Sequence, residues 1–354
     1  MTSTASHDNT RGHRFIAHAR DEWYPLCRSE QLRGRPLAAE LFGLPIVLFR
    51  STAGVPAALV DRCPHRNVPL SLGRVRGDCL QCAYHGWKFD ASGACRAVPG
   101  LVGDVRAHER RAGAFAARDA QGFVWVYGRE GAQPAREPYV FPYVGEPGWH
   151  SARETLDVDA SLHAVAENAL DVPHTAFLHG GLFRSENRAR REIDVVVRRA
   201  SDRVEAEYIG ESRPPGIVAR LLAPRGGDVL HFDRFILPSV AQVEYRLGES
   251  GLCISAALAP LADYRTRLAV TFSYRLPVPG ALVRPILRHF ALRIFRQDAR
   301  MLARQTETIR RFNEESYKFT EIDVLGAEIF DLMRGAESGG RPDVTRERRI
   351  RIAV

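Results

Sequence analysis

The feature that most constrains this chain is a pair of cysteine–histidine groups within its first hundred residues. Cys63 and His65 are separated by one residue, and Cys82 and His85, which follow sixteen residues after the first group, are separated by two. Two thiolates and two imidazoles bind either zinc or an iron–sulfur cluster. A proline lies inside the first group and a glycine follows the second, as expected of tight turns that fold over a buried site.

Zinc sites and iron–sulfur clusters differ in the usual spacing of their cysteine and histidine ligands. Zinc fingers usually place a CxxC pair first and a histidine pair later, whereas here each cysteine has its own histidine. The arrangement therefore favours a [2Fe–2S] cluster in which two histidines replace two of the cysteines on one iron. Cys79 forms a CxxC with Cys82, and we interpret it as a small core residue of a strand and not as a ligand.

The motifs CPHR and CAYHGW resemble those of the Rieske domain in Rieske non-heme iron oxygenases. Respiratory Rieske proteins have two further loop cysteines joined in a disulfide, and Val68 and Tyr84 stand at those places here. The resemblance is thus with the low-potential oxygenase or ferredoxin branch. It implies a [2Fe–2S] Rieske cluster held by the two cysteines and two histidines named above.

Length and composition bound the remaining possibilities. With 354 residues, the chain is too long for a lone Rieske ferredoxin and suits two domains. Six scattered cysteines form no disulfide framework, which predicts a cytoplasmic location. The polar N-terminus lacks the apolar stretch of a signal peptide, and no run of about 18 apolar residues predicts a transmembrane segment.

The net charge of +8 comes almost entirely from arginine. No nucleic-acid-binding motif accompanies it, so we expect an acidic protein partner, a ferredoxin or reductase, and no nucleic acid.

Hydrophobic patterning divides the chain into five parts. They are a flexible tail (1–20), an all-β domain (21–130), a proline-rich linker (131–150), a second domain (151–335) and a charged tail (336–354). In the second domain the patterns predict a helix at Ser161–Leu170, a long helix at Ala281–Phe312 with a break near Pro285, and a helix from Thr320 to Gly335. Strands are predicted at Ile193–Val197, Val204–Ile209, Gln242–Leu247, Leu252–Leu258 and Leu268–Tyr274.

A second group of metal-ligand residues lies between 167 and 179. His174 and His179 are five residues apart, about 140° around an ideal helix, so they can share a metal only where a helix ends or bulges. Pro173 disrupts a helix at that point. A 2-His-1-carboxylate iron site also needs one carboxylate, and both Asp171 and Asp298 are candidates.

Asp298 is the one charged residue on the apolar face of the predicted long helix. A buried carboxylate requires a cation, which can be a metal or one of the many arginines. The residues alone leave the choice between Asp171 and Asp298 open.

The pattern Asn-x-x-Asp-x-x-His-x4-His resembles the mononuclear iron motif of Rieske oxygenases. By this resemblance His174, His179 and Asp298 bind the iron. Asp171 corresponds to the aspartate that links the site to a cluster histidine of a neighbouring chain, and Asn168 to the active-site asparagine.

The resemblance implies an α+β fold, with an all-β Rieske domain followed by a helix-grip catalytic domain of antiparallel sheet and long C-terminal helix. It also implies a homotrimer that uses O2, mononuclear Fe(II) and electrons from NAD(P)H through a separate reductase or ferredoxin. The chain is closest in length to monooxygenases and oxidative demethylases, so hydroxylation or demethylation of a hydrophobic ring compound is the expected reaction. Cis-dihydroxylation is one alternative, and an electron-transfer or iron-sensing Rieske protein is another.

The sequence does not identify the substrate. Seven apolar residues are candidates for the substrate cavity or for the core: Phe177, Leu178, Leu182, Phe183, Phe232, Phe235 and Ile236.

Overall fold

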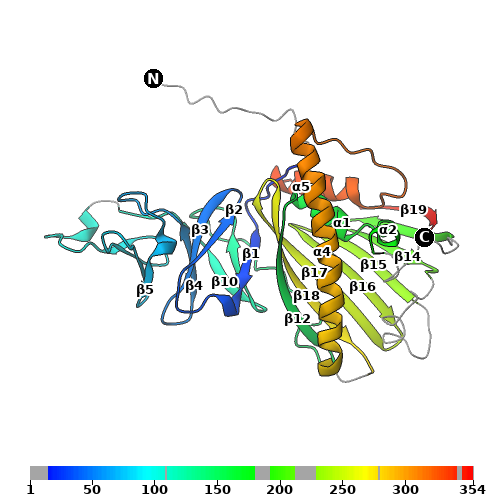
Figure 1. Ribbon diagram of the computed structural model, residues 1–354, viewed down its shortest axis with the longest axis horizontal. Helices are drawn as coiled ribbons and strands as arrows, with labels where there is room; N and C mark the ends of the chain where they lie inside the picture. Colours follow the sequence, from blue (N-terminus) through cyan, green and yellow to red (C-terminus); the bar gives the residue numbers. More distant parts are fainter. Residues whose placement is uncertain are drawn as a thin grey trace.

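The computed structural model describes residues 15–107, 110–179, 192–211, 229–277, 280–340 and 345–353. Two β-rich units lie side by side, and the long helix α4 (Gly280–Phe312) runs along the second unit (Figure 1). No helix among these residues is long and apolar enough to cross a membrane.

The first unit contains three antiparallel sheets, with strand orders β1-β11-β10, β2-β3-β4-β9 and β5-β6-β7-β8. The strands are β1 (Trp23–Arg28), β2 (Leu37–Leu41), β3 (Leu44–Arg50), β4 (Pro56–Val60), β5 (Arg74–Arg76), β6 (Cys79–Gln81), β7 (Lys88–Phe89), β8 (Cys95–Ala97), β9 (Ala114–Phe115), β10 (Ala117–Ala120) and β11 (Phe123–Tyr127). Short 3-10 helices occur at Ser29–Gln31, Leu70–Leu72 and Val105–Ala107. The loop between β6 and β7 contains Cys82 and His85. The segment between β4 and β5 contains Cys63 and His65.

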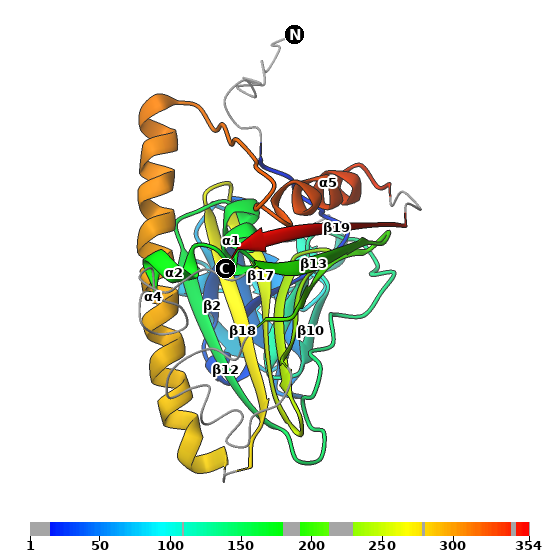
Figure 2. The ribbon, with the colours of Figure 1, turned by 90° about the vertical axis from the view of Figure 1, so that its right-hand side faces the viewer.

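The second unit is built on an eight-stranded antiparallel sheet of order β12-β18-β17-β16-β15-β14-β13-β19. Its strands are β12 (His150–Val158), β13 (Glu192–Arg199), β14 (Arg203–Ile209), β15 (Val229–Ile236), β16 (Val240–Leu247), β17 (Ser250–Ala262), β18 (Arg265–Arg275) and β19 (Arg346–Ala353). Side chains from α4 and from the helices α1 (Leu162–Ala169) and α5 (Gly326–Glu337) join those of the sheet in one core cluster. Figure 2 shows α4 along the β12 edge of the sheet and α5 across one end.

The predicted α+β architecture is confirmed, and local chemistry explains where its elements begin. Ser161 caps α1 because its hydroxyl accepts a hydrogen bond from the backbone N–H of Ala164 at 3.2 Å. Pro285 lies inside α4, which continues through it without the expected break. The last helix starts later than predicted, since the carboxylate of Asp323 accepts hydrogen bonds from both the backbone and hydroxyl of Thr320 and closes a turn there.

Both ends of the described chain pack against the second unit. The Phe15 ring, which the sequence placed in the tail, stacks on His163 at 5.1 Å and also contacts Phe330 of α5. Residues 346–353, which the sequence placed in a charged tail, form β19. Ile350 and Ile352 alternate with Arg349 and Arg351, so that Ile352 is buried opposite Ile193 while Arg349 and Arg351 lie on the other face of the strand.

Candidate metal centres

The first candidate centre lies where two similar turns of the first unit meet. The N–H of Asn67 donates to the carbonyl of Cys63 at 2.9 Å, and that of Gly86 to the carbonyl of Cys82 at 3.2 Å. Gly86 has a φ of +72°, and a Cβ there would lie 3.1 Å from Pro99, so glycine suits this turn. The turns bury both cysteines and leave their thiols free.

The histidines of the two turns lie beside each other. The rings of His65 and His85 have centroids 4.5 Å apart, and His65 stacks on Trp87 with an interplanar angle of 5°. The Nδ1 atom of His65 is buried and has no hydrogen-bond partner among the described residues. Burial raises the pKa of the Cys63 thiol to about 11, a backbone hydrogen bond from His65 opposes this, and neighbouring Cys82 adds to it. A buried imidazole nitrogen without a hydrogen-bond partner and two buried free thiols fit an iron–sulfur cluster. The positively charged irons of such a cluster would bind the nitrogen and stabilise the thiolates.

The second candidate centre joins α4 to the short helix α2 (Thr175–Leu178). His174 immediately precedes α2 and His179 immediately follows it, and a turn that contains Pro173 separates α2 from α1. His179 Nε2 lies 3.0 Å from Asp298 Oδ1, and His174 Nε2 lies 3.5 Å from the same oxygen. One ligand-type atom from each of the three side chains lies within 4.8 Å of the others.

The charges of this site are arranged to hold a cation. Burial lowers the pKa of His174, but the carboxylates of Asp171 and Asp298 outweigh it and raise the pKa to about 9. Burial raises the pKa of Asp298, and the adjacent imidazoles of His174 and His179 lower it further than burial raises it. His174 Nε2 and Asp298 Oδ1 have no hydrogen-bond partner in the described part of the chain. Two inward nitrogens and one carboxylate fit the donor set of a mononuclear iron site.

The outward nitrogens of both imidazoles also have partners. His174 Nδ1 lies 3.2 Å from Asp171 Oδ2, and His179 Nδ1 lies 3.0 Å from Gln297 Oε1. Asp298 therefore lies beside the Nε2 atoms of the two imidazoles, and Asp171 lies on the opposite side of His174, beside its Nδ1. Sequence reasoning gave Gln297 no role, although its position next to Asp298 was visible.

Asn168 lies at the end of α1 and lines a groove of about 750 Å³ together with Asp171 and residues of α4. On the α4 side of this groove, the side chains of Met301 and Phe312 are 54% and 71% exposed. The outer face of the second centre is therefore open and partly apolar.

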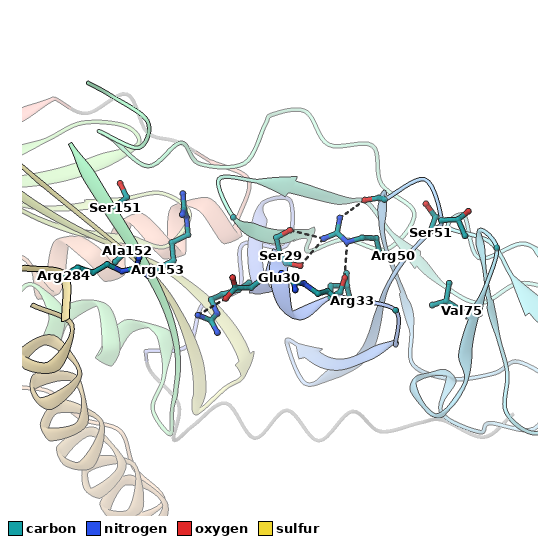
Figure 3. A pocket seen from close by; sticks show the side chains of 17 residues that line it. Ser29, Glu30, Arg33, Arg50, Ser51, Val75, Ser151, Ala152, Arg153 and Arg284 are labelled. Atoms are coloured by element: carbon teal, nitrogen blue, oxygen red, sulfur yellow. Dashed lines mark hydrogen bonds and ion pairs between the residues drawn. The ribbon is translucent and has the colours of Figure 1, made fainter. Parts of the chain in front are cut away.

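A separate basic groove of about 950 Å³ lies between the two units (Figure 3). Five arginines line it, and Glu30 is the one acidic residue among the described residues that do so. The arginines are Arg28, Arg33, Arg50, Arg153 and Arg284.

The candidate cavity residues are distributed over several environments. Phe235 is fully buried in the core of the second unit, Ile236 packs against a different core cluster, and Phe177 is 59% exposed. Leu182 and Phe183 lie outside the described residues.

Comparison with known proteins gives matches to both units. Residues 22–108 match the family of Rieske [2Fe-2S] domains, and residues 158–334 match the vanillate O-demethylase oxygenase C-terminal domain. The vanillate O-demethylase oxygenase subunit of Pseudomonas sp. is 25% identical over 90% of this chain and 95% of its own length. The dicamba O-demethylase oxygenase component of Stenotrophomonas maltophilia is 30% identical over 51% of this chain and 54% of its own.

The fold also matches solved structures. Dicamba monooxygenase bound to dicamba superposes with a TM-score of 0.78 over 91% of this chain and 98% of that one, at 21% identity. The chain spans 54% of the length of protein TIC 55 from Arabidopsis thaliana, with which it is 26% identical. It therefore covers about half of some of its curated relatives and nearly all of others.

Proposed function

Because this chain belongs to the Rieske non-heme iron oxygenases that carry a vanillate O-demethylase-type C-terminal domain, we propose that it is the oxygenase component of such a system. The observation that carries the proposal is the triad of His174, His179 and Asp298, with ligand atoms within 4.8 Å of one another. The same chain holds the paired cysteine–histidine turns of a Rieske centre, so one chain has ligands for both an electron store and an oxygen-activating iron.

The residues have distinct tasks in this proposal. Cys63, Cys82, His65 and His85 would hold the [2Fe–2S] cluster, and the triad would hold Fe(II). When bound, the two centres supply single-electron transfer and activation of O2. The Asp171 carboxylate accepts a hydrogen bond from Nδ1–H of His174 across 3.2 Å, which leaves the Nε2 lone pair of that imidazole free for the metal.

The expected reaction is hydroxylation or oxidative demethylation of a hydrophobic ring compound. One oxygen atom enters a C–H bond and the other leaves as water, which requires two electrons and two protons. In a demethylation, the hydroxylated methyl group then leaves as formaldehyde. The names of several relatives support this choice, since these proteins are demethylases for vanillate, dicamba and methylxanthines. Cis-dihydroxylation of an aromatic ring is the runner-up reaction.

The electrons come from NAD(P)H through a separate reductase or ferredoxin. The net charge of +8 and the five arginines of the basic groove favour an acidic donor. We expect the KM for the donor protein to rise with ionic strength, and a KM that does not change from low to high salt would remove the electrostatic part of this proposal. The free cysteines support a cytoplasmic location.

We infer a homotrimer, as the family resemblance implies, and the placement of the two centres in the molecule supports it. The sheet with the cluster turns and the helix α2 lie at opposite ends of the molecule (Figure 1), which favours an electron path between neighbouring copies. The groove beside Asp171 is partly apolar, and Leu72 and Tyr84 near the cluster turns are 67% and 63% exposed. A head-to-tail contact between such different surfaces forms a ring where its rotation closes, and we propose that three copies close it.

The function is tested by O2 uptake with a reductase and a panel of ring compounds. The expected result is uptake that depends on one class of compound, with a hydroxylated product or formaldehyde released in proportion. The Asp298→Ala variant is the control, because it keeps the cluster ligands and loses the triad. A cluster that is reduced and reoxidised normally without substrate-dependent uptake would favour an electron-transfer protein instead.

A further inference from the structure

One contact of the second centre has no role in the scheme above. Nδ1 of His179 lies 3.0 Å from Oε1 of Gln297, while Nε2 of the same ring lies 3.0 Å from Asp298 Oδ1. Gln297 and Asp298 are neighbours in α4, so a single turn of this helix faces both nitrogens of one imidazole. The ring is 2% exposed, and water cannot readily replace either partner.

The chemistry of the ring decides the direction of this hydrogen bond. A neutral imidazole has one N–H and one lone pair. If Nε2 binds a metal, it uses the lone pair, so the proton sits on Nδ1 and must be donated. The amide oxygen of Gln297 is the acceptor at that position. With the proton on Nε2 instead, Nδ1 would need a donor and the ring could not bind the metal through Nε2.

We propose that Gln297 is a positioning residue that holds His179 in the Nδ1–H tautomer and orients its Nε2 toward the metal. The inference rests on the proposed function, because it requires the triad to bind a metal ion.

The two histidines would then be held by partners of different charge. His174 faces Asp171, a carboxylate beside the open groove, whereas the more buried His179 faces a neutral amide. A carboxylate at 297 would add a third negative charge around the triad and would have to be desolvated there. An amide provides the acceptor without that charge, so the asymmetry follows from the burial of the two rings.

The test compares metal affinity in variants of α4, with Co(II) as the probe and the Rieske cluster left in place. The second centre is emptied with a chelator, and Co(II) affinity is measured by competition while the visible spectrum of the cluster confirms folding. Gln297→Leu keeps similar bulk and removes the acceptor. We expect it to bind Co(II) about 10- to 100-fold more weakly, the usual effect of losing an outer partner of a metal-binding histidine. Its Co(II) absorption bands should also shift, because the ring is no longer held in place.

Matched variants separate this role from a packing effect. Gln305→Leu makes the same change in the same helix, at a glutamine whose Oε1 is buried and has no hydrogen-bond partner among the described residues. It should keep the wild-type Co(II) affinity. Gln297→Glu restores an acceptor and should recover most of the affinity lost in Gln297→Leu. If Gln297→Leu does not fold, Gln297→Met, which is flexible and also lacks an acceptor, takes its place.

Each outcome bears on a different statement. A Gln297→Leu protein that binds Co(II) as tightly as wild type, with unchanged bands, overturns the role of Gln297 and leaves the proposed function intact. Equal losses in Gln297→Leu and Gln305→Leu would also overturn it, since packing would then explain both. If Asp298→Ala binds Co(II) as tightly as the wild type does, the proposed iron site itself is overturned, and this inference with it.

Discussion

A carboxylate at position 298 completes the charge balance of the second centre. It lies between two imidazoles, 3.0 Å from one and 3.5 Å from the other. We expect Asp298→Ala to lose the mononuclear iron while the cluster absorption stays, because the cluster ligands lie in the other unit. Iron and acid-labile sulfide analyses measure both. Full iron content in this variant would return Asp171 as the ligand.

Another buried histidine gives the protein a pH-dependent stability. His231 is 1% exposed and lies 2.7 Å from Glu211 and 3.0 Å from Asp233, with the rings of Tyr208 and Tyr245 stacked on its two faces. Burial lowers the pKa of His231, but the two carboxylates outweigh it and raise the pKa to about 9. A raised pKa stabilises the folded state at pH values below 6.5, and this contribution is lost as the pH rises through 9.

We therefore expect the free energy of unfolding to fall by roughly 3 kcal/mol between pH 6.5 and 9.5 through His231 alone. Denaturant unfolding of the metal-loaded protein at both pH values measures it. In the His231→Gln variant, which cannot carry this charge, the fall should be smaller by that amount. Parallel pH profiles for the two proteins would contradict the assignment.

Sequence spacing could identify some of these residues and not others. His174 and His179 share a local motif, and Asp298 stands out as a charge on an apolar helix face. Gln297 contacts a histidine 118 residues away, and His231 depends on carboxylates from neighbouring segments. No periodicity in the sequence specifies such long-range pairs.

At the scale of elements, five strands of the second unit were predicted, and β12, β15 and β19 were missed. β19 was missed because arginines dominate its composition, and Ile350 and Ile352 are its residues that pack in the core of the second unit. We expect Ile352→Ala to lower the free energy of unfolding by about 2–4 kcal/mol, the usual cost of removing a buried isoleucine side chain. Thermal or denaturant unfolding checks this.

Arg349→Ala on the same strand is the control for β19. Arg349 is exposed, so its removal should change the free energy of unfolding by less than about 0.5 kcal/mol. Equal effects of the two substitutions would mean that β19 does not contribute to the core in solution.

At the scale of the whole molecule, the two centres of one copy lie in different units, toward opposite ends of the molecule (Figure 1). The order of the two units followed from the resemblance to a known family. Their separation could not be predicted, because it depends on how the two units pack. If neighbouring copies complete the electron path, Asp171→Asn should keep both metals and lose most of the transfer from cluster to iron. The reason is that a neutral amide replaces the charged partner of His174.

Two measurements test this assembly. Native mass should correspond to three copies, and single-turnover experiments on prereduced protein should show slow transfer in Asp171→Asn. If Asp171 only stabilises the local turn, the variant would lose about 1 kcal/mol of stability and keep normal transfer. A monomer that turns over at full rate would also contradict the trimer.

The position of Asp298 in the middle of α4 has a consequence for the cooperativity of unfolding. A metal bound by α2 and α4 acts as a cross-link that closes a long loop, since His179 and Gln297 are already 118 residues apart. Such a link reduces the conformational entropy of the unfolded chain, much as a disulfide does over the same span. The bound ion would then stabilise the packing of α4 against the rest of the second unit. Amide hydrogen exchange in the middle of α4 should accelerate on chelation, while the strands β16 and β17 remain protected.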